Sequence, residues 1–367
     1  MNPPPYHIVT IDGDGIGPEV CRAAVTVLGE ACGSGLLRFD PRDGGADHYR
    51  RTGQVLPPDT FEACRAADAI LHGAAGIPGV VYPDGTEVGN DLHLQLRFRL
   101  DLFANVRPIR LYAGVQSPLR GFAPGSIDYV IIRENTEGLY ASRGAGVNLR
   151  GEVVTDSLVV TRKGTERVAR FAFELARRRN GAPLDGRRRV TVCDKANILR
   201  SYAFFRAVCD EVAAGYPDVQ IDYAYADAIT VHMLKKPGFY DVVVAENMFG
   251  DIISDLGAGT VGGLGIAASA EVGERHGLFQ GAHGSAPDIA GRDLASPVAT
   301  ILSGAMMLRW LADRHQDRHH HDRLRDGAAR IERAVEAVLA EGVAVPRDLG
   351  GTASCSEITA AVCRRLA

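Results

Sequence analysis

The sequence contains no CxxC pair, and its seven cysteines are odd in number and scattered along the chain. This pattern argues against a disulfide framework and against a zinc site, so we expect reduced thiols in the core. No apolar run approaches the roughly 18 residues that cross a bilayer, and the first residues lack a basic segment followed by an apolar stretch. We therefore expect a cytoplasmic protein without a membrane segment.

An excess of charge of one sign is also missing. The chain has 41 basic and 45 acidic side chains, a formal net charge of −4, and no long run of either sign. We therefore expect neither a nucleic acid nor a membrane surface as the principal partner. With 46% apolar and 23% charged residues, the composition is that of a soluble globular enzyme rather than a disordered or fibrous chain.

Short β-branched runs alternate with amphipathic patterns, which predicts an α/β fold built from βαβ units. A chain of 367 residues is long enough for two domains. The predicted strands are residues 7–11, 36–39, 69–74, 127–134, 153–162, 188–196, 221–227 and 241–247. The predicted helices are residues 18–31, 58–66, 92–102, 163–179, 297–313 and 323–341. The chain is rich in Gly and Ala after residue 257, which indicates a binding region, and we expect hinges near 105 and 257.

The motif GDGIG at 13–17 follows the first predicted strand and precedes Pro18. It matches a dinucleotide-binding fingerprint only loosely, because the glycine spacing differs and no acidic residue closes a second strand at the expected distance. A tight strand-to-helix turn with Pro at the first helical position explains it at least as well. Both interpretations stay open.

A set of arginines favours the binding of carboxylates, because a guanidinium group grips a carboxylate with two parallel hydrogen bonds. Arg97 lies on a predicted helix, Arg107 follows in ANVRPIRLY, and Arg133 ends a predicted strand. Arg97 and Arg133 stand beside apolar runs rather than in solvated charge clusters. Arg99 is two residues from Arg97 and cannot share its helical face, so we expect a surface or structural role for it.

Asp251 and Asp255 lie four residues apart after an apolar strand, hence on one face of a helix. Two such carboxylates repel each other unless a cation neutralises them, and with Asp227 as a third ligand they suit Mg²⁺ or Mn²⁺. The alternative is a helix start that collects acids because of its dipole.

Two further side chains have the chemistry of acid and base groups. Lys195 closes an apolar strand, where desolvation can leave it unprotonated and basic, and Tyr140 in ENTEGLY can deliver a proton. A lysine paired with Asp194 and an ordinary packed tyrosine would explain the same residues. In HGSAPDIAG at 283–291, small residues allow close approach of a ligand, and Asp288 can hold a ribose diol, which favours NAD over NADP.

Seven motifs occur in one order: GDGIGPE, RLDLFANVRP, VIIRENTEG, DKANIL, AENMFGDIISDLGA, HGSAPDIAG and DLGGTAS. Together they resemble the β-decarboxylating dehydrogenases, the family of the isocitrate, isopropylmalate, homoisocitrate and tartrate/D-malate dehydrogenases. The resemblance covers essentially the whole chain. It implies the two-domain α/β fold of isocitrate/isopropylmalate dehydrogenases rather than a Rossmann fold of the usual dinucleotide-binding type.

The resemblance also implies domains and site residues. Residues 1–105 and 257–367 would form a large NAD-binding domain, and residues 106–256 a small domain with the dimer interface, the catalytic lysine and the metal ligands. In the implied homodimer with two shared active sites, Lys195 and Asp227 would come from the neighbouring subunit. The implied sets are Arg97, Arg107 and Arg133 for substrate carboxylates; Tyr140 and Lys195 for catalysis; Asp227, Asp251 and Asp255 for Mg²⁺ or Mn²⁺; and His283, Gly284, Ser285, Ala286, Pro287, Asp288, Ile289 and Ser296 for NAD.

The implied reaction is oxidation of a 2-hydroxy acid by NAD, with Lys195 as the base, followed by loss of the β-carboxylate as CO₂ and protonation at C3 by Tyr140. The metal would stabilise the developing negative charge. Ser296 stands where the family usually has Asn, which affects one adenine contact. FQGAHG replaces the commoner FEPVHG before the cofactor motif.

In the family that the sequence resembles, the helix that corresponds to the one carrying Arg97 helps to select the substituent at C3 of the substrate. Asn90, Asp91, His93 and Leu94 stand where isopropylmalate enzymes present leucines, and a buried polar group without a partner costs about 1 to 3 kcal/mol. Asp91 would repel a third carboxylate, which a protonated His93 would offset. Our leading prediction is therefore tartrate, D-malate or another polar 3-substituted malate. The alternatives are 3-isopropylmalate, isocitrate and homoisocitrate.

Three other functions were considered as alternatives to a decarboxylating dehydrogenase. A non-catalytic regulatory subunit of a heteromeric dehydrogenase would have lost part of the catalytic set, whereas the tyrosine, the lysine, three aspartates and three arginines are all present. A nucleotide-binding module would leave the acids and Lys195 unexplained, and only product analysis separates a dehydrogenase that does not decarboxylate. The cluster at His319, His320 and His321 indicates a solvated loop rather than a metal site.

Overall fold

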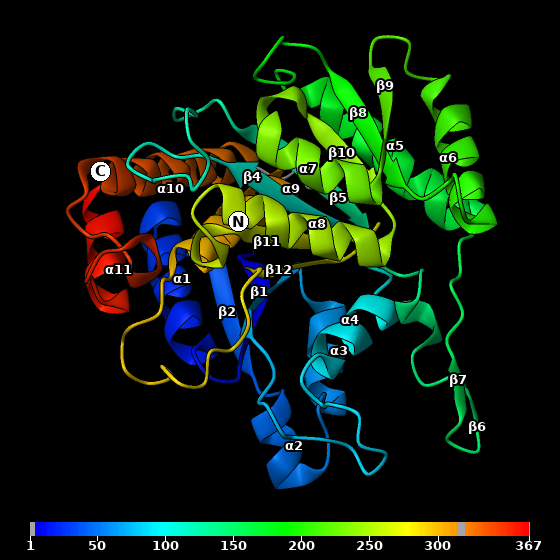
Figure 1. The fold of residues 1–367 in the computed structure, drawn as a ribbon. Coiled ribbons are helices and arrows are strands. Elements are labelled where there is room, and N and C mark those ends of the chain that lie inside the picture. Colours follow the sequence, from blue (N-terminus) through cyan, green and yellow to red (C-terminus); the bar gives the residue numbers. More distant parts are fainter. Residues whose placement is uncertain (1–3, 315–319, 367) are drawn as a thin grey trace. The chain divides into compact units, whose positions relative to one another are not determined.

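The computed structural model describes residues 4–314 and 320–366, drawn as a ribbon in Figure 1. The chain divides into two compact units, each described by itself below. Unit 1 comprises Met1–Leu102, Tyr112–Gln116 and Gly262–Ala367, and unit 2 comprises Phe103–Leu111 and Ser117–Val261. Both units combine helices with a largely parallel set of strands, so the predicted α/β class is confirmed.

The strands of unit 1 lie in the order β2, β1, β3, β12, β11. Their bounds are β1 Tyr6–Gly13, β2 Leu37–Arg42, β3 Ala69–Ala74, β11 Ala268–Val272 and β12 Gly277–Gly281. β1 is parallel to β2 and β3, β12 is parallel to β3, and β11 is antiparallel to β12. All six residues of β3 are buried, as expected for a central strand with helices on both faces.

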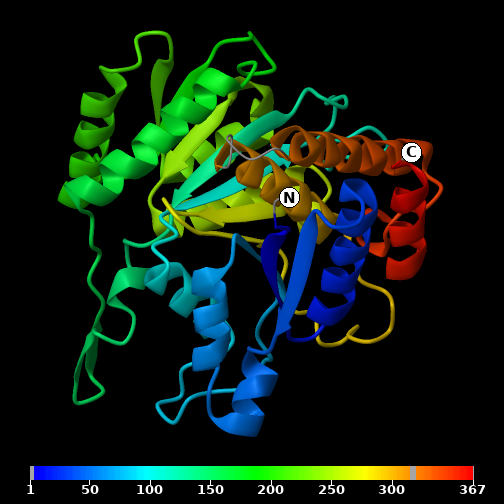
Figure 2. The same cartoon turned by 180° about the vertical axis from the view of Figure 1, so that it is seen from behind.

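Seven α-helices and two short 3₁₀ helices of unit 1 lie within the described residues. They are α1 Gly17–Cys32, α2 Ala46–Thr52, α3 Pro58–Ala66, α4 Asp91–Arg99, α9 Val298–Arg314, α10 His321–Glu341, α11 Cys355–Arg364, η3 Leu264–Ile266 and η4 Arg347–Leu349. α1 and α9 pack against the strands, and α10 and α11 pack against those helices (Figure 2). His321 begins α10 and pairs with Asp322, whereas His319 lies outside the described residues.

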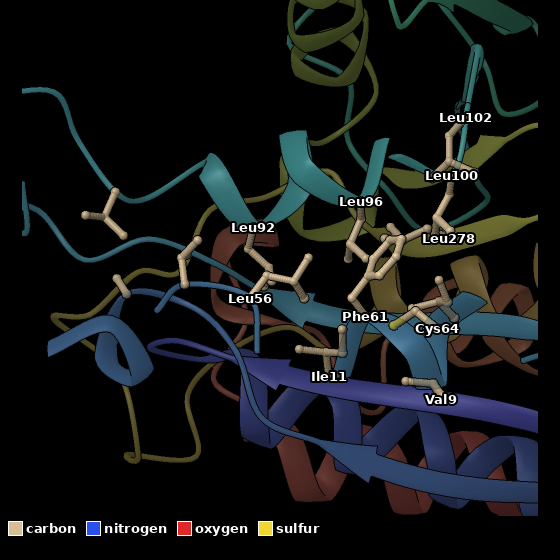
Figure 3. Packing of buried hydrophobic residues seen from close by; sticks show 14 of the residues in the cluster. Val9, Ile11, Leu56, Phe61, Cys64, Leu92, Leu96, Leu100, Leu102 and Leu278 are labelled. Carbon is tan, nitrogen blue, oxygen red and sulfur yellow. The ribbon is translucent and has the colours of Figure 1, made fainter. Parts of the chain in front are cut away.

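A second apolar layer anchors α4 to the strands. Leu92 and Leu96 on the inner face of α4 point toward Phe61 of α3 and Ile11 of β1 (Figure 3). Both leucines are fully buried. Side chains four residues apart share one face of a helix, so this packing fixes which face of α4 turns inward.

Unit 2 has strands in the order β4, β5, β10, β8, β9, with β4 antiparallel to β5 and the others parallel. The strand bounds are β4 Ala104–Arg110, β5 Asp128–Glu134, β8 Arg189–Asp194, β9 Gln220–Tyr225 and β10 Val242–Ala245. The helices are α5 Arg162–Arg178, α6 Arg200–Ala213, α7 Ala226–Lys235, α8 Asn247–Thr260, η1 Tyr140–Ser142 and η2 Pro237–Phe239. α5 packs with α6 and α7 packs with α8 (Figure 1).

A two-stranded hairpin extends from unit 2, and one of its strands is shorter than the strand predicted over 153–162. β6 Val147–Leu149 pairs only with β7 Val153–Thr155, and Figures 1 and 2 show this hairpin reaching away from the other elements of unit 2. The prediction of one strand over 153–162 was wrong beyond residue 155. Val159 is exposed and pairs with Gly138 only in an isolated bridge, and Thr161 then caps α5.

The glycine-rich region after residue 257 holds more regular structure than predicted. Residue 257 lies inside α8, and two fully buried strands, β11 and β12, follow. Their small residues carry little of the β-branched signal by which strands are predicted from sequence. The unit boundary itself falls between Val261 and Gly262.

The seven cysteines are free, as predicted, and all but Cys363 are buried. Burial raises the pKa of several of these thiols, that of Cys32 and Cys64 to about 12, so they are protonated and unreactive at neutral pH. Within the described ranges, no helix is both long enough and apolar enough to cross a membrane.

Candidate active site

The acidic pair predicted from spacing lies on α8 at the end of a buried strand. β10 supplies four buried residues, and Glu246 then caps the helix by accepting a hydrogen bond from the backbone N–H of Met248 at 3.2 Å. Asp251 and Asp255 follow one turn apart, and both are partly exposed. The strand thus presents two carboxylates on one helical face.

Two of the three predicted substrate arginines lie against this pair. Arg133 of β5 forms an ion pair with Asp251, and Arg107 of β4 places its guanidinium 3.5 Å from Asp255 and 3.8 Å from Asp251. A Cβ atom on Gly250 would lie 2.7 Å from Cβ of Arg133, so the glycine lets the arginine cross α8 closely. Both arginines are buried.

Two asparagines that the sequence reasoning missed hold these arginines in place. The Nε and Nη2 atoms of Arg133 donate to Oδ1 of Asn247 at 2.9 and 2.7 Å, and Nε of Arg107 donates to Oδ1 of Asn105 at 2.8 Å. Both asparagines are fully buried. A polar residue of this kind gives no sequence signal, because its role depends on a partner brought near by the fold.

Tyr140 joins the same cluster. Its hydroxyl donates to Oδ2 of Asp251 at 3.1 Å, and the guanidinium carbon of Arg133 lies 5.4 Å from the centre of its ring. The structure therefore brings Tyr140, Arg107, Arg133, Asp251 and Asp255 together in unit 2.

The acidic pair is electrostatically strained. Burial raises the pKa of Asp255, and the negative charge of Asp251 raises it further, whereas Arg107 and Arg133 lower it. Carboxylate oxygens are hard ligands, and a divalent cation between the two groups would remove their repulsion. The residues present therefore fit Mg²⁺ or Mn²⁺.

Lys195 and Asp227 form a separate pair. Lys195 follows β8, Asp227 lies in the first turn of α7, and Nζ donates to Oδ1 at 2.6 Å. The Asp227 side chain is 72% exposed, and the lysine lowers the pKa of its carboxyl group.

Asp227 does not join the other two acids within one chain. In the part of the chain that the structure describes, no three His, Cys, Asp or Glu side chains lie close enough together to hold a metal ion. Within one chain, Asp227 is therefore held by Lys195 and does not meet Asp251 and Asp255. This separation is compatible with the prediction that Asp227 serves a neighbouring subunit.

The third predicted arginine, Arg97, lies in unit 1 and already has a carboxylate partner. Its Nε and Nη2 atoms donate to Oε2 and Oε1 of Glu271 at 3.0 and 2.7 Å. The two side chains are 7% and 1% exposed. Glu271 was not predicted as a partner of Arg97, because it lies on β11, 174 residues away along the chain. Arg99 is exposed and stacks on Phe61 at 3.3 Å, which confirms a structural role.

The two polar residues of α4 that were predicted to contact the substrate, Asp91 and His93, also have partners in unit 1. Asp91 accepts hydrogen bonds from the hydroxyl of Tyr82 at 2.6 Å and from Nε2 of Gln95 at 2.8 Å. His93 lies against the ring of His72 on β3, with ring centres 4.5 Å apart. His72 is a further residue that the sequence reasoning missed.

His72 is fully buried, and its ring nitrogens make no hydrogen bond of ordinary geometry with a described residue. Burial lowers the pKa of His72 well below 6.5, the neighbouring His93 lowers it further and His283 does so weakly, and Glu271 and the backbone of Ile11 oppose these effects. The ring is therefore neutral at neutral pH.

Replacing His72 with leucine should raise the free energy of unfolding at neutral pH by about 1 to 3 kcal/mol, because the buried polar ring is replaced by an apolar group of similar size. The gain should grow as the pH falls below 6.5, since the unfolded state of the wild type then binds a proton that the folded state excludes. Urea unfolding at pH of about 7.5 and about 5 measures both effects. The partly exposed His276, changed to leucine, is the control, and destabilisation at both pH values would contradict the prediction.

The predicted cofactor motif packs on the GDGIG turn within unit 1. The backbone N–H of Ile16 donates to the carbonyl oxygen of Ser285 at 2.8 Å, and a Cβ atom on Gly15 would lie 2.0 Å from that oxygen. Gly13 and Gly15 have φ angles of 72° and 59°, and α1 begins with Pro in its first turn. The tight-turn interpretation of GDGIG is confirmed, and the turn also positions the motif at 283–291.

The loop at 283–289 has an exposed and strained backbone. Ala286 has a φ of 36°, which is unusual for a residue other than glycine and typical of functional loops. Gly284, Pro287 and Asp288 are exposed, and no atom lies within 4 Å of where a Cβ of Gly284 would be. Such a loop suits close approach of a ligand.

The other predicted cofactor residues flank this loop. Nδ1 of His283 lies 3.0 Å from the carbonyl oxygen of Gly284, and the backbone N–H of Ile289 donates to the carbonyl of Ala286. Ser296 donates to the carbonyl oxygen of Gly265 at 2.9 Å.

Comparison with known proteins supports the resemblance. Residues 7–362 match the family model for isocitrate/isopropylmalate dehydrogenase. A 3-isopropylmalate/3-methylmalate dehydrogenase of Methanocaldococcus jannaschii is 42% identical over 98% of this chain and 99% of its own length. A 3-isopropylmalate dehydrogenase of Mycobacterium bovis is 44% identical over 91% of this chain and 94% of its own.

A solved structure matches as well. The isocitrate dehydrogenase of Methylococcus capsulatus has a TM-score of 0.85 and 36% identity, and the match covers 98% of this chain and 99% of that chain. The recognition and the fold class predicted from the seven motifs are thereby confirmed. The chain belongs to the isocitrate/isopropylmalate dehydrogenase family of decarboxylating oxidoreductases.

Proposed function

We propose that the chain catalyses the NAD-dependent oxidative decarboxylation of a 3-alkylmalate such as 3-isopropylmalate or 3-methylmalate. The observation that carries the proposal is the convergence of Tyr140, Arg107 and Arg133 on the paired carboxylates Asp251 and Asp255. The names of the relatives at 42% and 44% identity favour 3-isopropylmalate, an alternative in the sequence analysis, over tartrate or D-malate.

Each member of this cluster would have a defined task. Arg107 and Arg133 would bind the carboxylates of the malate unit, held in orientation by Asn105 and Asn247. Asp251 and Asp255 would hold Mg²⁺ or Mn²⁺, which when bound supplies positive charge where negative charge develops during the reaction. The arginines that pair with these acids in the structure would then turn their charge to the substrate.

Two side chains would move protons. Lys195 would accept the proton of the 2-hydroxyl while C2 loses a hydride to NAD and the C2–O bond becomes a carbonyl. After loss of the β-carboxylate as CO₂, Tyr140 would protonate C3 of the enolate that remains. The hydrogen bond from Tyr140 to Asp251 fixes the position of the phenol.

The loop at 283–289 would hold NAD, which accepts the hydride from C2 of the substrate. Gly284, Pro287 and Asp288 expose backbone and one carboxylate there, and the carboxylate would pair with a ribose diol. Ser285 and Ala286 would support the loop on the GDGIG turn, with His283, Ile289 and Ser296 beside them.

We also propose a homodimer with two shared active sites. Within one chain, Lys195 and Asp227 lie apart from Asp251 and Asp255. A complete set of three metal ligands would therefore include Asp227 of a second chain. Unit 2 exposes large apolar side chains that such an interface would cover. They are Val147, Leu149, Val153, Val154, Ile198, Leu199, Val231, Leu234 and Ile252.

The substrate is tested by following NADH formation with Mg²⁺ or Mn²⁺ on 3-isopropylmalate, 3-methylmalate, D-malate, the tartrates, isocitrate and homoisocitrate, with CO₂ measured in parallel. We expect the 3-alkylmalates to give the highest kcat/KM, with one CO₂ released for each NADH. NADH without CO₂ would indicate a dehydrogenase that does not decarboxylate. No turnover on any of them would overturn the proposal and favour the regulatory subunit.

A further inference from the structure

Asp194 closes β8 immediately before Lys195, and its carboxylate is fully buried. Its partner is Arg206 of α6, whose Nε and Nη2 atoms donate to Oδ2 and Oδ1 at 2.8 Å each. The backbone N–H of Ala196 also donates to Oδ1 at 2.8 Å. Lys195 bonds instead to Asp227. The structure therefore does not support the alternative in which Lys195 pairs with Asp194, because Arg206 takes that place.

Aromatic rings on β9 contact Arg206 beside this carboxylate. β9 is the parallel neighbour of β8, and Tyr225 stands opposite Asp194 in the register. The guanidinium carbon of Arg206 lies 4.9 Å from the ring centre of Tyr223 and 5.3 Å from that of Tyr225. Nζ of Lys195 lies 5.9 Å from the centre of the same Tyr225 ring. A guanidinium suits this place, because it forms two parallel bonds to a carboxylate and also stacks on aromatic rings.

The two acids that flank Lys195 differ in how well water screens them. The Asp227 side chain is 72% exposed, whereas that of Asp194 is 0% exposed. An exposed ion pair contributes little to stability, but a buried carboxylate without a partner is strongly unfavourable. In the absence of Arg206, the buried carboxylate would draw a nearby flexible cation, and Lys195 is the adjacent residue along the chain. The ammonium group of Lys195 would then leave Asp227.

We propose that Arg206 is a positioning residue for the catalytic lysine: by occupying Asp194, it keeps Nζ of Lys195 on Asp227. This inference rests on the proposed function, in which Lys195 accepts the proton of the 2-hydroxyl. Arg206 itself touches no substrate in this proposal. Its effect passes through the direction of the lysine side chain, so it belongs to the oxidation step and not to the step that Tyr140 serves.

Replacing Arg206 with methionine should lower kcat for oxidation about tenfold or more, because the uncompensated Asp194 then withdraws Lys195. Adding Asp194→Asn removes the competing charge and should restore kcat to within about threefold of the wild type. Exchange of the C3 proton of the 2-oxo acid product with D₂O reports on Tyr140 and should change less than about twofold in both variants. Each rate is normalised to the folded fraction of the protein. A merely structural role would lower oxidation and exchange together.

Arg179→Met is the matched control in the same unit. Nε of Arg179 donates to Oδ1 of Asp241 at 2.7 Å, and the Asp241 side chain is 0% exposed, but valine and not lysine follows it. Asp241 precedes β10 whereas Asp194 ends β8, so the two pairs lie at opposite ends of parallel strands. The control variant should lose stability, and the kcat of its folded fraction should stay within about twofold of the wild type.

Two results of these measurements would overturn the inference and leave the proposed function standing. One is a comparable loss of kcat in Arg179→Met and in Arg206→Met. The other is a double variant, Arg206→Met with Asp194→Asn, that recovers no turnover.

A crystal structure of Arg206→Met tests the inference without any turnover. Nζ of Lys195 should lie within hydrogen-bonding distance of Asp194 and, unlike in the wild type, should no longer contact Asp227. If Nζ stays on Asp227, the inference is overturned, even where no malate is oxidised and the proposed function fails. Arg206→Gln removes the charge but can still donate hydrogen bonds to Asp194. It replaces Arg206→Met if the methionine variant does not fold, and the same displacement of Lys195 is expected.

Discussion

Replacing Lys195 with methionine should lower kcat for oxidation by about a thousandfold, within the range that a positioned acid–base group contributes. Methionine keeps the length and flexibility of the side chain but cannot accept a proton. Nζ of Lys195 lies 2.6 Å from Oδ1 of Asp227, so a hydrogen bond already orients the lysine side chain. The measurement is NADH formation under saturating substrate, compared with the wild type.

NAD binding should be unchanged in the same variant, because Lys195 is not among the residues proposed to hold NAD, which are those of the loop at 283–289 and Ser296. Quenching of intrinsic fluorescence by added NADH measures the affinity. Lys163, exposed on α5, is the control position, and its change to methionine should leave kcat within about twofold of the wild type. If Lys195→Met keeps a tenth or more of wild-type turnover, the base is another group.

Replacing Asp255 with asparagine should separate metal binding from folding. Without metal, the variant should be at least as stable as the wild type, because burial and the charge of Asp251 both disfavour the ionised Asp255. With Mn²⁺ at about 100 times its dissociation constant, the wild type should gain about 2.7 kcal/mol and the variant much less. Thermal unfolding with and without Mn²⁺ gives both results, and turnover should fall by about a hundredfold or more.

Asp348→Asn is the control for this experiment. Burial also raises the pKa of Asp348, but the residue lies in η4 of unit 1, so its change should leave the Mn²⁺-dependent shift intact. An equal shift in Asp255→Asn and in the wild type would show that the cation binds elsewhere.

Mixing the two inactive proteins tests the shared site directly. In a dimer made of one Lys195→Met chain and one Asp255→Asn chain, one active site would carry both changes and the other neither. After unfolding and refolding an equal mixture, about a quarter of wild-type turnover should return. A site completed within one chain would recover nothing.

Strongly patterned elements were predicted closely from the sequence. α3 and β3 have the predicted bounds, and α5 and α9 differ by one residue at each end. In each of them local apolar spacing and burial agree. β4, β11 and β12 were missed, because Pro108 interrupts the first and small residues dominate the other two.

The residues of the candidate site also fall into those that were predicted from the sequence and those that were not. Charged residues in motifs were found, since their type and spacing carry the chemistry. Their partners were not: Glu271 is 174 residues from Arg97 and Asn247 is 114 residues from Arg133. Only the fold brings such pairs together, and an isolated Asn or Glu in the sequence resembles any surface residue.

The discontinuity of unit 1 has a consequence for biosynthesis. β12 pairs with β3 through Leu278 and Ile70, so this edge of β3 stays open until more than two hundred later residues have left the ribosome. Unit 2, by contrast, is encoded almost without interruption and can fold first. A strand that has one open edge and whose six residues all become buried is prone to aggregate, and closing so long a loop is slow. During synthesis, the part of the chain most exposed to aggregation is therefore unit 1, which includes the proposed cofactor loop.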